Sequence, residues 1–115
     1  MIEYNKNFGA YAVEFDDAII LWDDEPDENY METAQKLRDA YYRNIRKIAE
    51  AIMEDIQDIY EVTDVDEVID KLDKPAIRPE IEEVTYCYHR FDNEHIIIFE
   101  YRGEFEKIGY VSVDG

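Results

Sequence analysis

The middle of the chain has a helical pattern of hydrophobic positions. Its apolar residues recur at steps of three and four, which places them on one face of an α-helix. Asn29, with Glu32 three residues later, matches an N-cap and capping box. The pattern predicts one helix over residues 30–59, about 45 Å long, that must cross the whole core. The stripe is formed by Ala34, Leu37, Tyr41, Ile45, Ile48, Ile52, Ile56 and Ile59.

A second, shorter helix is expected after residue 63 or 64. Thr63 or Asp64 can cap it, and its apolar side is formed by Val65, Val68, Ile69 and Leu72. Pro75 and Pro79 end this helix and break the chain before the next element.

Strands are predicted on both sides of the helices. Residues 11–15 alternate apolar and small or polar positions, Asp16-Asp17 can turn the chain, and residues 18–22 form an apolar run. The two segments predict a β-hairpin.

The last third predicts a three-stranded meander. Strands are expected over residues 82–91, 94–102 and 105–113, with two-residue turns at Asp92-Asn93 and Gly103-Glu104. This register gives one apolar and aromatic face that should pack on the long helix. That face contains Tyr86, Tyr88, His95, Ile97, Phe99, Ile108 and Tyr110.

These elements together predict an α+β fold in two layers. The element order is ββ-αα-βββ, with an antiparallel sheet packed on one long helix. Residues 1–115 are expected to form a single domain, and no repeat or flexible linker interrupts them.

Composition excludes several classes of protein. Hydrophobic residues make up 46% of the chain, which is too many for a disordered acidic tail, and a single cysteine excludes an internal disulfide. The longest apolar runs are far shorter than the roughly 20 residues of a membrane span. The first residues lack the basic and apolar regions of a signal peptide. We therefore expect a soluble, cytoplasmic protein.

The net charge of −18 is larger than solubility asks of a small domain. Residues 14–28 contain eight acidic and no basic residues, residues 29–49 contain five basic and two acidic residues, and residues 50–73 contain ten acidic residues and Lys71. Such a charge disfavours nucleic acids and membranes and favours a basic protein or metal ions as partner. Solubility alone explains the acidic blocks equally well.

The helix surface and its flanking loop carry the candidate binding residues. Acids spaced four apart, Glu50, Glu54 and Asp58, repel one another and oppose the helix dipole near the C-terminal end. A ridge kept against local stability suggests a cationic partner, while a merely solvated face is the alternative. Tyrosine beside acids suits a protein-binding surface. The expected partner-binding residues are Asp23, Asp24, Glu25, Asp27, Glu28, Glu50, Glu54, Asp58 and Tyr60.

Catalytic chemistry is weakly indicated. His89 and His95 flank one predicted turn and point to opposite faces, so they should not share a metal ion, although another register would bring them together. His95 is expected to be a hydrogen-bonded structural residue, and Cys87 a buried, inert thiol.

Metal and cofactor motifs are missing from the sequence. The loop 23–28 fails the EF-hand pattern, because Glu28 stands where glycine is needed and Ala34 where glutamate is needed. No phosphate-binding loop, dinucleotide glycine motif or nucleophile elbow occurs. We therefore expect no catalytic residue, no metal site and no cofactor.

The two ends of the chain resemble a group of small uncharacterised bacterial domains. The matching features are Phe8-Gly9 before a short strand, a His95-Ile96-Ile97 strand, and a terminal Asp114-Gly115. The group has no established activity. Several similar small acidic α+β proteins are immunity proteins that block a basic toxin, and this likeness implies such a role by analogy.

The sequence thus favours a non-catalytic acidic domain that binds a basic protein, with an immunity-type inhibitor of a basic toxin as one form. A stand-alone structural or oligomeric domain is the first alternative, and a small metal-dependent enzyme using His89, His95 and nearby acids is the second. The oligomeric state is left open.

Overall fold

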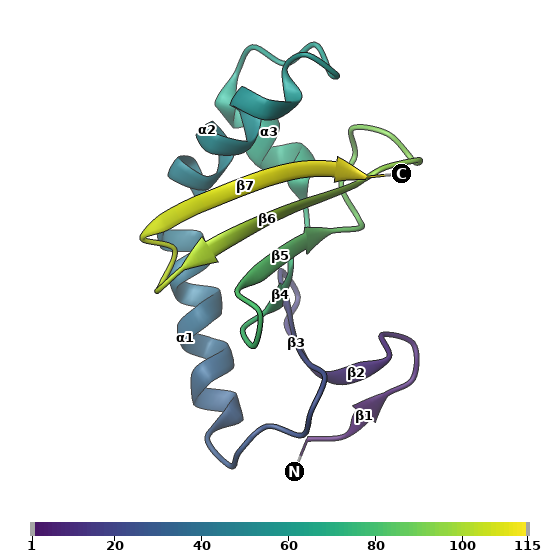
Figure 1. Cartoon of the computed structure of the whole chain (residues 1–115), viewed down its shortest axis with the longest axis vertical. Coiled ribbons are helices and arrows are strands. Elements are labelled where there is room, and N and C mark those ends of the chain that lie inside the picture. The colour runs from purple at the N-terminus through teal and green to yellow at the C-terminus, as the bar shows by residue number, and fades with distance from the viewer. Residues whose placement is uncertain (1, 115) are drawn as a thin grey trace.

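The computed structural model describes residues 2–114, which fold into one seven-stranded sheet and three helices. The strands lie in the sheet in chain order, from β1 to β7, and the helices cover one face of it (Figure 1). The strands are β1 (Tyr4–Asn5), β2 (Ala10–Glu14), β3 (Ile19–Trp22), β4 (Ala76–Arg78), β5 (Glu83–Tyr86), β6 (Ile96–Arg102) and β7 (Lys107–Asp114). The helices are α1 (Tyr30–Arg43), α2 (Ile45–Ile56) and α3 (Val65–Leu72).

The sheet is mixed, not purely antiparallel as predicted. β3 and β4 pair in parallel, and all the other neighbouring strands are antiparallel. A parallel pair needs a long crossover connection, and the three helices between β3 and β4 supply it. The prediction of mixed α and β structure is confirmed, whereas the prediction of an antiparallel sheet on one long helix is wrong.

The N-terminal hairpin is confirmed. β2 pairs with β3 from Tyr11 opposite Trp22 to Glu14 opposite Ile19. The backbone N–H of Phe15 donates to the carbonyl of Ala18 and closes the turn, at 2.8 Å. β1 adds a short strand outside β2 that the sequence pattern did not indicate.

The predicted long helix is interrupted at Asn44. This residue has φ −110° and ψ 13°, and its side-chain amide donates to the carbonyl of Ala40 at 2.8 Å. An asparagine side chain that bonds nearby backbone competes with the helical pattern, so α1 ends and α2 starts around it. The apolar stripe continues across the break, because Tyr41 and Ile48 are both buried. The predicted capping box is also wrong, since the Asn29 side chain makes no capping hydrogen bond.

The region after α2 differs from its prediction by one strand. Asp64 caps α3 as expected, and its carboxylate accepts from the N–H of Asp66 at 2.9 Å. Between Pro75 and Pro79 the chain does not merely break but forms β4, which lies in the middle of the sheet between β3 and β5.

The C-terminal meander exists, but both of its connections are longer than predicted. β5 ends at Tyr86 and β6 begins at Ile96, so residues 87–95 form a loop in place of a two-residue turn. Residues 103–106 connect β6 to β7. Gly103 in this connection has φ +65°, a backbone conformation that residues with a Cβ atom rarely adopt.

A bulge in β7 changes which side chains face the helices. Tyr101 lies opposite Ile108, whereas Phe99 lies opposite Val111, so two residues of β7 stand opposite Glu100 alone. The expected apolar face is therefore wrong at Tyr110, which is 74% exposed. It is also wrong at Tyr88, which is 52% exposed because β5 ends at Tyr86 and Tyr88 lies in the loop that follows.

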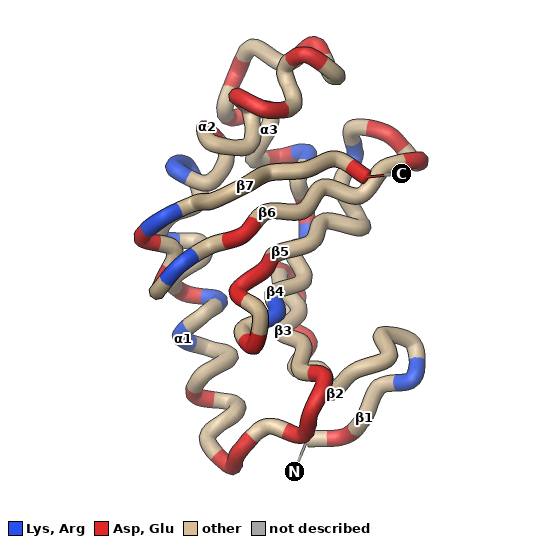
Figure 2. The backbone as a smooth tube through the Cα atoms, viewed as in Figure 1, with Lys and Arg blue, Asp and Glu red and all other residues tan. Residues whose placement is uncertain are grey.

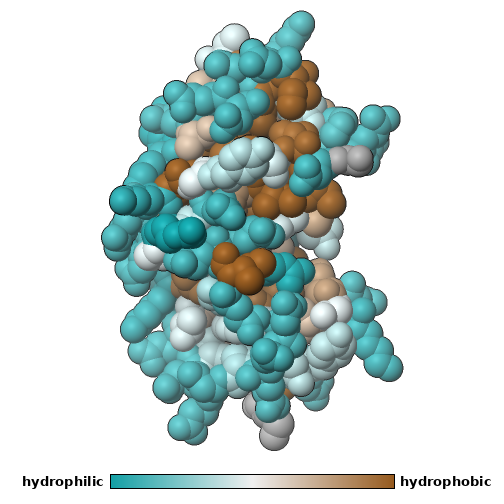
Figure 3. Space-filling model, in the orientation of Figure 1, coloured by the Kyte–Doolittle hydropathy of each residue, from teal (hydrophilic) through white to brown (hydrophobic). Residues whose placement is uncertain are grey.

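The main core lies between the helices and the sheet. Tyr41 of α1 and Tyr86 of β5 are fully buried there, and their hydroxyl oxygens are 2.6 Å apart. A smaller cluster of Ala10, Ile19 and Leu21 lies apart from the main core. Figure 3 shows a mostly hydrophilic surface on which hydrophobic side chains gather at the centre and the upper right, with a hollow on the right-hand side.

Candidate functional site

The expected partner-binding residues lie at opposite ends of the molecule. The loop 23–28 is at the bottom of Figure 2, next to the N-terminus, while the acids of α2 and the loop behind it are at the top. The molecule extends 43 Å along this axis. The structure therefore does not bring Asp23 and Asp24 together with Glu50 and Asp58 on one surface.

The upper end carries acids that form no ion pair with any other described residue. No lysine, arginine or histidine occurs between Ile48 and Asp70. Six exposed carboxylates of this segment make no ion pair with any residue from 2 to 114. We call them the acidic end: Glu50, Glu54, Asp55, Asp58, Glu61 and Asp64.

Other acids nearby are paired, which makes the contrast sharper. Asp66 of α3 accepts from Arg46 at 2.9 Å, and Asp70 lies 3.1 Å from Arg90. Glu67 faces Lys71 one helical turn away, at 3.9 Å. Three cations of this region are thus paired with acids of α3. Lys47 borders the acidic end, and its ammonium group donates to the carbonyls of Phe105 and Glu106.

A groove runs along part of the acidic end. It has a volume of about 730 Å³ and lies between α2 and the start of α3. Glu50, Glu54 and Asp64 line it together with Lys47, and Ala51 and Val65 give it apolar walls. Carboxylates around an apolar surface suit a lysine or arginine side chain, whose stem is apolar and whose head is charged.

The loop 23–28 is built differently. The carboxylate of Asp23 lies 3.4 Å from Arg78, and its backbone N–H donates to Glu80 at 2.6 Å. Asp27 accepts from the N–H of Asn29 at 2.9 Å. These contacts fix the loop ahead of the N-terminus of α1, where the helix dipole stabilises negative charge.

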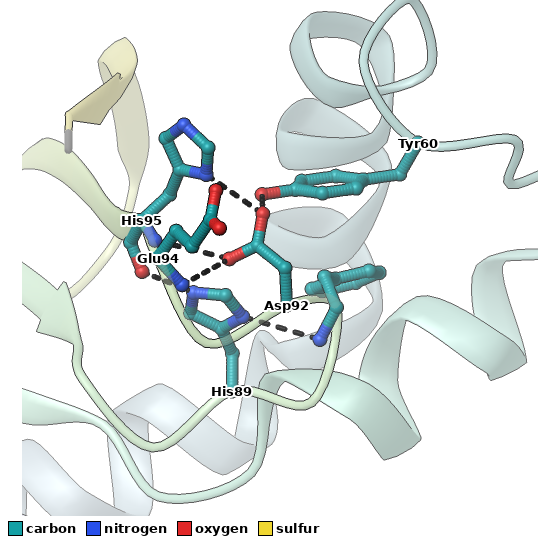
Figure 4. A network of polar contacts seen from close by, with 6 residues as sticks. Tyr60, His89, Asp92, Glu94 and His95 are labelled. Atoms are coloured by element: carbon teal, nitrogen blue, oxygen red, sulfur yellow. Dashed lines mark hydrogen bonds and ion pairs between the residues drawn. The ribbon is translucent and has the colours of Figure 1, made fainter.

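Tyr60 belongs to a polar network that the sequence did not indicate (Figure 4). Its hydroxyl donates to Oδ2 of Asp92 at 2.6 Å, and Nδ1 of His95 donates to the same oxygen at 2.7 Å. Oδ1 of Asp92 accepts from the backbone N–H groups of Glu94 and His95, each at 3.0 Å. The Asp92 carboxylate thus accepts four hydrogen bonds and connects the loop 87–95 to Tyr60 in the segment that follows α2.

The surroundings of this network lower the pKa of Asp92 and raise the pKa of Tyr60. Hydrogen bonds from Tyr60 and then from His95 and two backbone N–H groups hold the pKa of Asp92 well below its usual range. Burial, with the bond to Asp92, raises the pKa of Tyr60 to about 12. Both shifts favour the state in which the phenol donates to an ionised carboxylate.

The second histidine closes the same loop. The N–H of Phe91 donates to Nδ1 of His89 at 3.2 Å, so Nε2 carries the proton and donates to the carbonyl of His95 at 2.6 Å. The His89 side chain is buried, and the Phe91 ring stacks on Tyr60 with centroids 5.1 Å apart. His89 and His95 therefore lie in one loop and not on opposite faces of a strand pair.

This network has the geometry of a structural anchor. His95 is hydrogen-bonded, as expected, and Asp92 orients its ring. Within residues 2–114 no group of three histidine, cysteine or acidic side chains could hold a metal ion. In the sequence, the one signal of the contact between Asp92 and His95 is their spacing, which allows an aspartate to cap its own turn.

Cys87 is exposed, which corrects the expectation of a buried thiol. The strand ends one residue before it, so its side chain is no longer held in the sheet. It lines a hollow of about 510 Å³ whose floor includes Ile19, Leu21 and Ala76.

The part of the chain that the structure describes contains no helix long and apolar enough to cross a bilayer. Comparison with family models, with curated proteins and with solved structures found no match to this chain.

Proposed function

We propose that this protein is a non-catalytic binding protein whose acidic end receives a basic surface of another protein. The observation that supports this most directly is the set of six exposed carboxylates from Glu50 to Asp64 without an ion pair in the described chain. They would steer the encounter and pair with lysine or arginine on the partner.

The helix dipole affects the two acidic blocks in opposite ways. The loop 23–28 precedes the N-terminus of α1, where acids are stabilising, so local structure accounts for it. Glu54 and Asp55 lie in the last turn of α2, which contains no basic residue. Negative charge there opposes the dipole, and Glu50 and Glu54 also repel each other at four-residue spacing. An arrangement that costs local stability favours a role in binding over solubility alone.

The groove and Tyr60 supply contact area beside the charges. Lysine or arginine stems can lie against Ala51 and Val65, and the Tyr60 ring is held in place by Asp92 and Phe91. Rigid tyrosine beside carboxylates is typical of protein interfaces. An immunity-type inhibitor of a basic toxin is a specific form of this proposal that rests on analogy.

The test uses two variants that remove the same amount of charge from the two ends. A protein captured from native lysate is identified by mass spectrometry, produced pure, and its association rate is measured at several salt concentrations. One variant neutralises five of the six carboxylates of the acidic end and keeps Asp64, which caps α3: Glu50→Gln, Glu54→Gln, Asp55→Asn, Asp58→Asn and Glu61→Gln. The matched control neutralises the other end: Asp16→Asn, Asp24→Asn, Glu25→Gln, Asp27→Asn and Glu28→Gln.

We expect the first variant to slow association by roughly tenfold or more at low salt and to flatten its salt dependence. The control should keep most of the wild-type rate. Equal losses in both variants would show that overall charge matters and not the acidic end. A rate that is insensitive to ionic strength in the wild-type protein would sink the proposal.

A further inference from the structure

The outer edge of β7 has no strand beside it in the described chain. β7 is the last strand in the sheet order, and at eight residues it is the longest of the seven (Figure 1). The opposite edge is formed by β1, which has only two residues. Backbone N–H and C=O groups along a free strand edge can pair with another strand.

Natural proteins usually protect such an edge with charged residues, prolines or bulges. β7 contains no charged residue and no proline from Ile108 to Val113, in a chain of which 37% is charged. Between its charged ends, Lys107 and Asp114, its one protection is the bulge opposite Glu100. Beyond the bulge, Val111 to Asp114 pair with β6 in a regular register, so their outer backbone groups form a continuous edge.

The charges around this part of the edge are negative. Asp114 pairs with Ile96, which places it close to Glu94 in the adjoining loop. Neither carboxylate makes an ion pair with a residue from 2 to 114. α2, which carries Glu50 and Glu54, packs against β7 on the helical side of the sheet, and the acidic end lies above β7 in Figure 2.

We propose that an extended basic segment of the partner adds to the sheet as an eighth strand along Val111–Asp114. This inference rests on the proposed function and specifies how the partner is held. Backbone hydrogen bonds to β7 hold the segment. Side chains of a strand alternate between the two faces of the sheet. The segment's lysine or arginine side chains therefore lie beside Asp114 on the helix-free face, which is opposite to the face of Val111 and Val113. The exposed ring of Tyr110 provides an apolar contact at the other end of the paired stretch.

The test compares two peptides of equal charge with blocked ends. One contains four Lys-Val repeats, which can form a strand, and the other contains four Lys-Pro repeats, in which proline removes half of the backbone donors. Amide hydrogen exchange and chemical shifts of the labelled full-length protein are followed during titration. We expect the Lys-Val peptide to slow exchange at Val111–Asp114 by roughly tenfold, and the Lys-Pro peptide to leave it unchanged.

Two variants of β7 sharpen the result. Ser112→Lys places a positive charge on the helix-free side of the edge and should abolish the protection by the Lys-Val peptide, while Ser112→Thr should preserve it. Urea titration of both variants shows whether the fold is intact.

The other outcomes separate this inference from the function it rests on. If both peptides shift Glu50 and Glu54 alike and neither protects β7, strand addition is wrong and the proposed function stands. If neither peptide shifts any resonance, both are overturned. If β7 amides become protected when the protein alone is concentrated, a second copy occupies the edge and the inference is overturned.

Discussion

The hydrogen bond between Tyr41 and Tyr86 gives a quantitative test of the core. Tyr41 is 1% exposed, Tyr86 is 0% exposed, and their hydroxyl oxygens lie 2.6 Å apart. Burial raises the pKa of both phenols, which shows how far water is excluded from the pair. Each hydroxyl is the other's hydrogen-bonding partner.

Removal of one hydroxyl should therefore cost more than removal of both. Tyr41→Phe or Tyr86→Phe leaves a buried hydroxyl without its partner, which costs about 1–3 kcal/mol. In the double variant no polar group is left unpaired, and replacement by rings of nearly the same shape should be close to neutral. The coupling energy from the double-mutant cycle should then equal the sum of the two single losses, about 2–6 kcal/mol.

Urea unfolding followed by the fluorescence of Trp22 measures these energies. Trp22 is the only tryptophan and is buried, so its emission reports the loss of the core. Tyr110→Phe, at a position that is 74% exposed, serves as the control and should change the midpoint little. If the double variant loses the sum of the two single losses, the two phenols act independently and the argument fails.

Three further predictions concern pH and the backbone. Burial raises the pKa of Tyr42, Tyr60 and Tyr101 to about 12. Their contribution to stability is therefore complete below about pH 10 and is lost as the pH rises through 12. Unfolding and tyrosine absorbance, measured against pH, should titrate together. The lowered pKa of Asp92 contributes stability above about pH 4 that is lost as the pH falls further, so Asp92→Asn should make the urea midpoint less dependent on pH in acid. Gly103→Ala should destabilise the protein by about 1 kcal/mol, since φ is +65° and the new Cβ would lie 3.1 Å from the Glu106 carboxyl group. The control is Gly109→Ala, where the atom nearest to the new Cβ is 3.4 Å away. It should lower stability less in the same urea titration.

The parts of the fold that local pattern determines were predictable. The alternation in residues 11–15 predicts β2, because a strand with one buried face must repeat every two residues. The apolar stripe predicts the buried face of α1 and α2, and Asp64 caps α3 because a short acidic side chain can reach the free N–H groups there. Each of these depends on neighbours within a few residues.

The parts that depend on distant contacts were not predictable. Asn44 interrupts the helix by bonding to Ala40 within the helix and to the carbonyl of Glu104, sixty residues away. β4 is three residues between two prolines, and only its neighbours β3 and β5 make it a strand. No local signal contains those partners.

The candidate site shows the same division. The acids of residues 50–64 and their lack of nearby cations are visible in the sequence. The Tyr60 anchor is not, because it requires the loop 87–95 in place of the expected two-residue turn. Asp92 was expected at the centre of that turn, where its carboxylate would have pointed into solvent and could not have received the Tyr60 hydroxyl.

The contacts of Tyr60 with Asp92 and Phe91 also hold in place the carboxylates that repel one another after α2. Glu54, Asp58 and Glu61 repel one another, and none of the three forms an ion pair with another described residue. The hydrogen bond from Tyr60 to Asp92 and the stacking on Phe91 hold the segment that follows α2 against the loop 87–95. A segment whose acids only kept the molecule dispersed would need no such attachment, because mobile charges repel other molecules equally well. Fixing the charges is useful when a partner must meet them in one arrangement, since ordering them at the moment of binding would reduce the affinity.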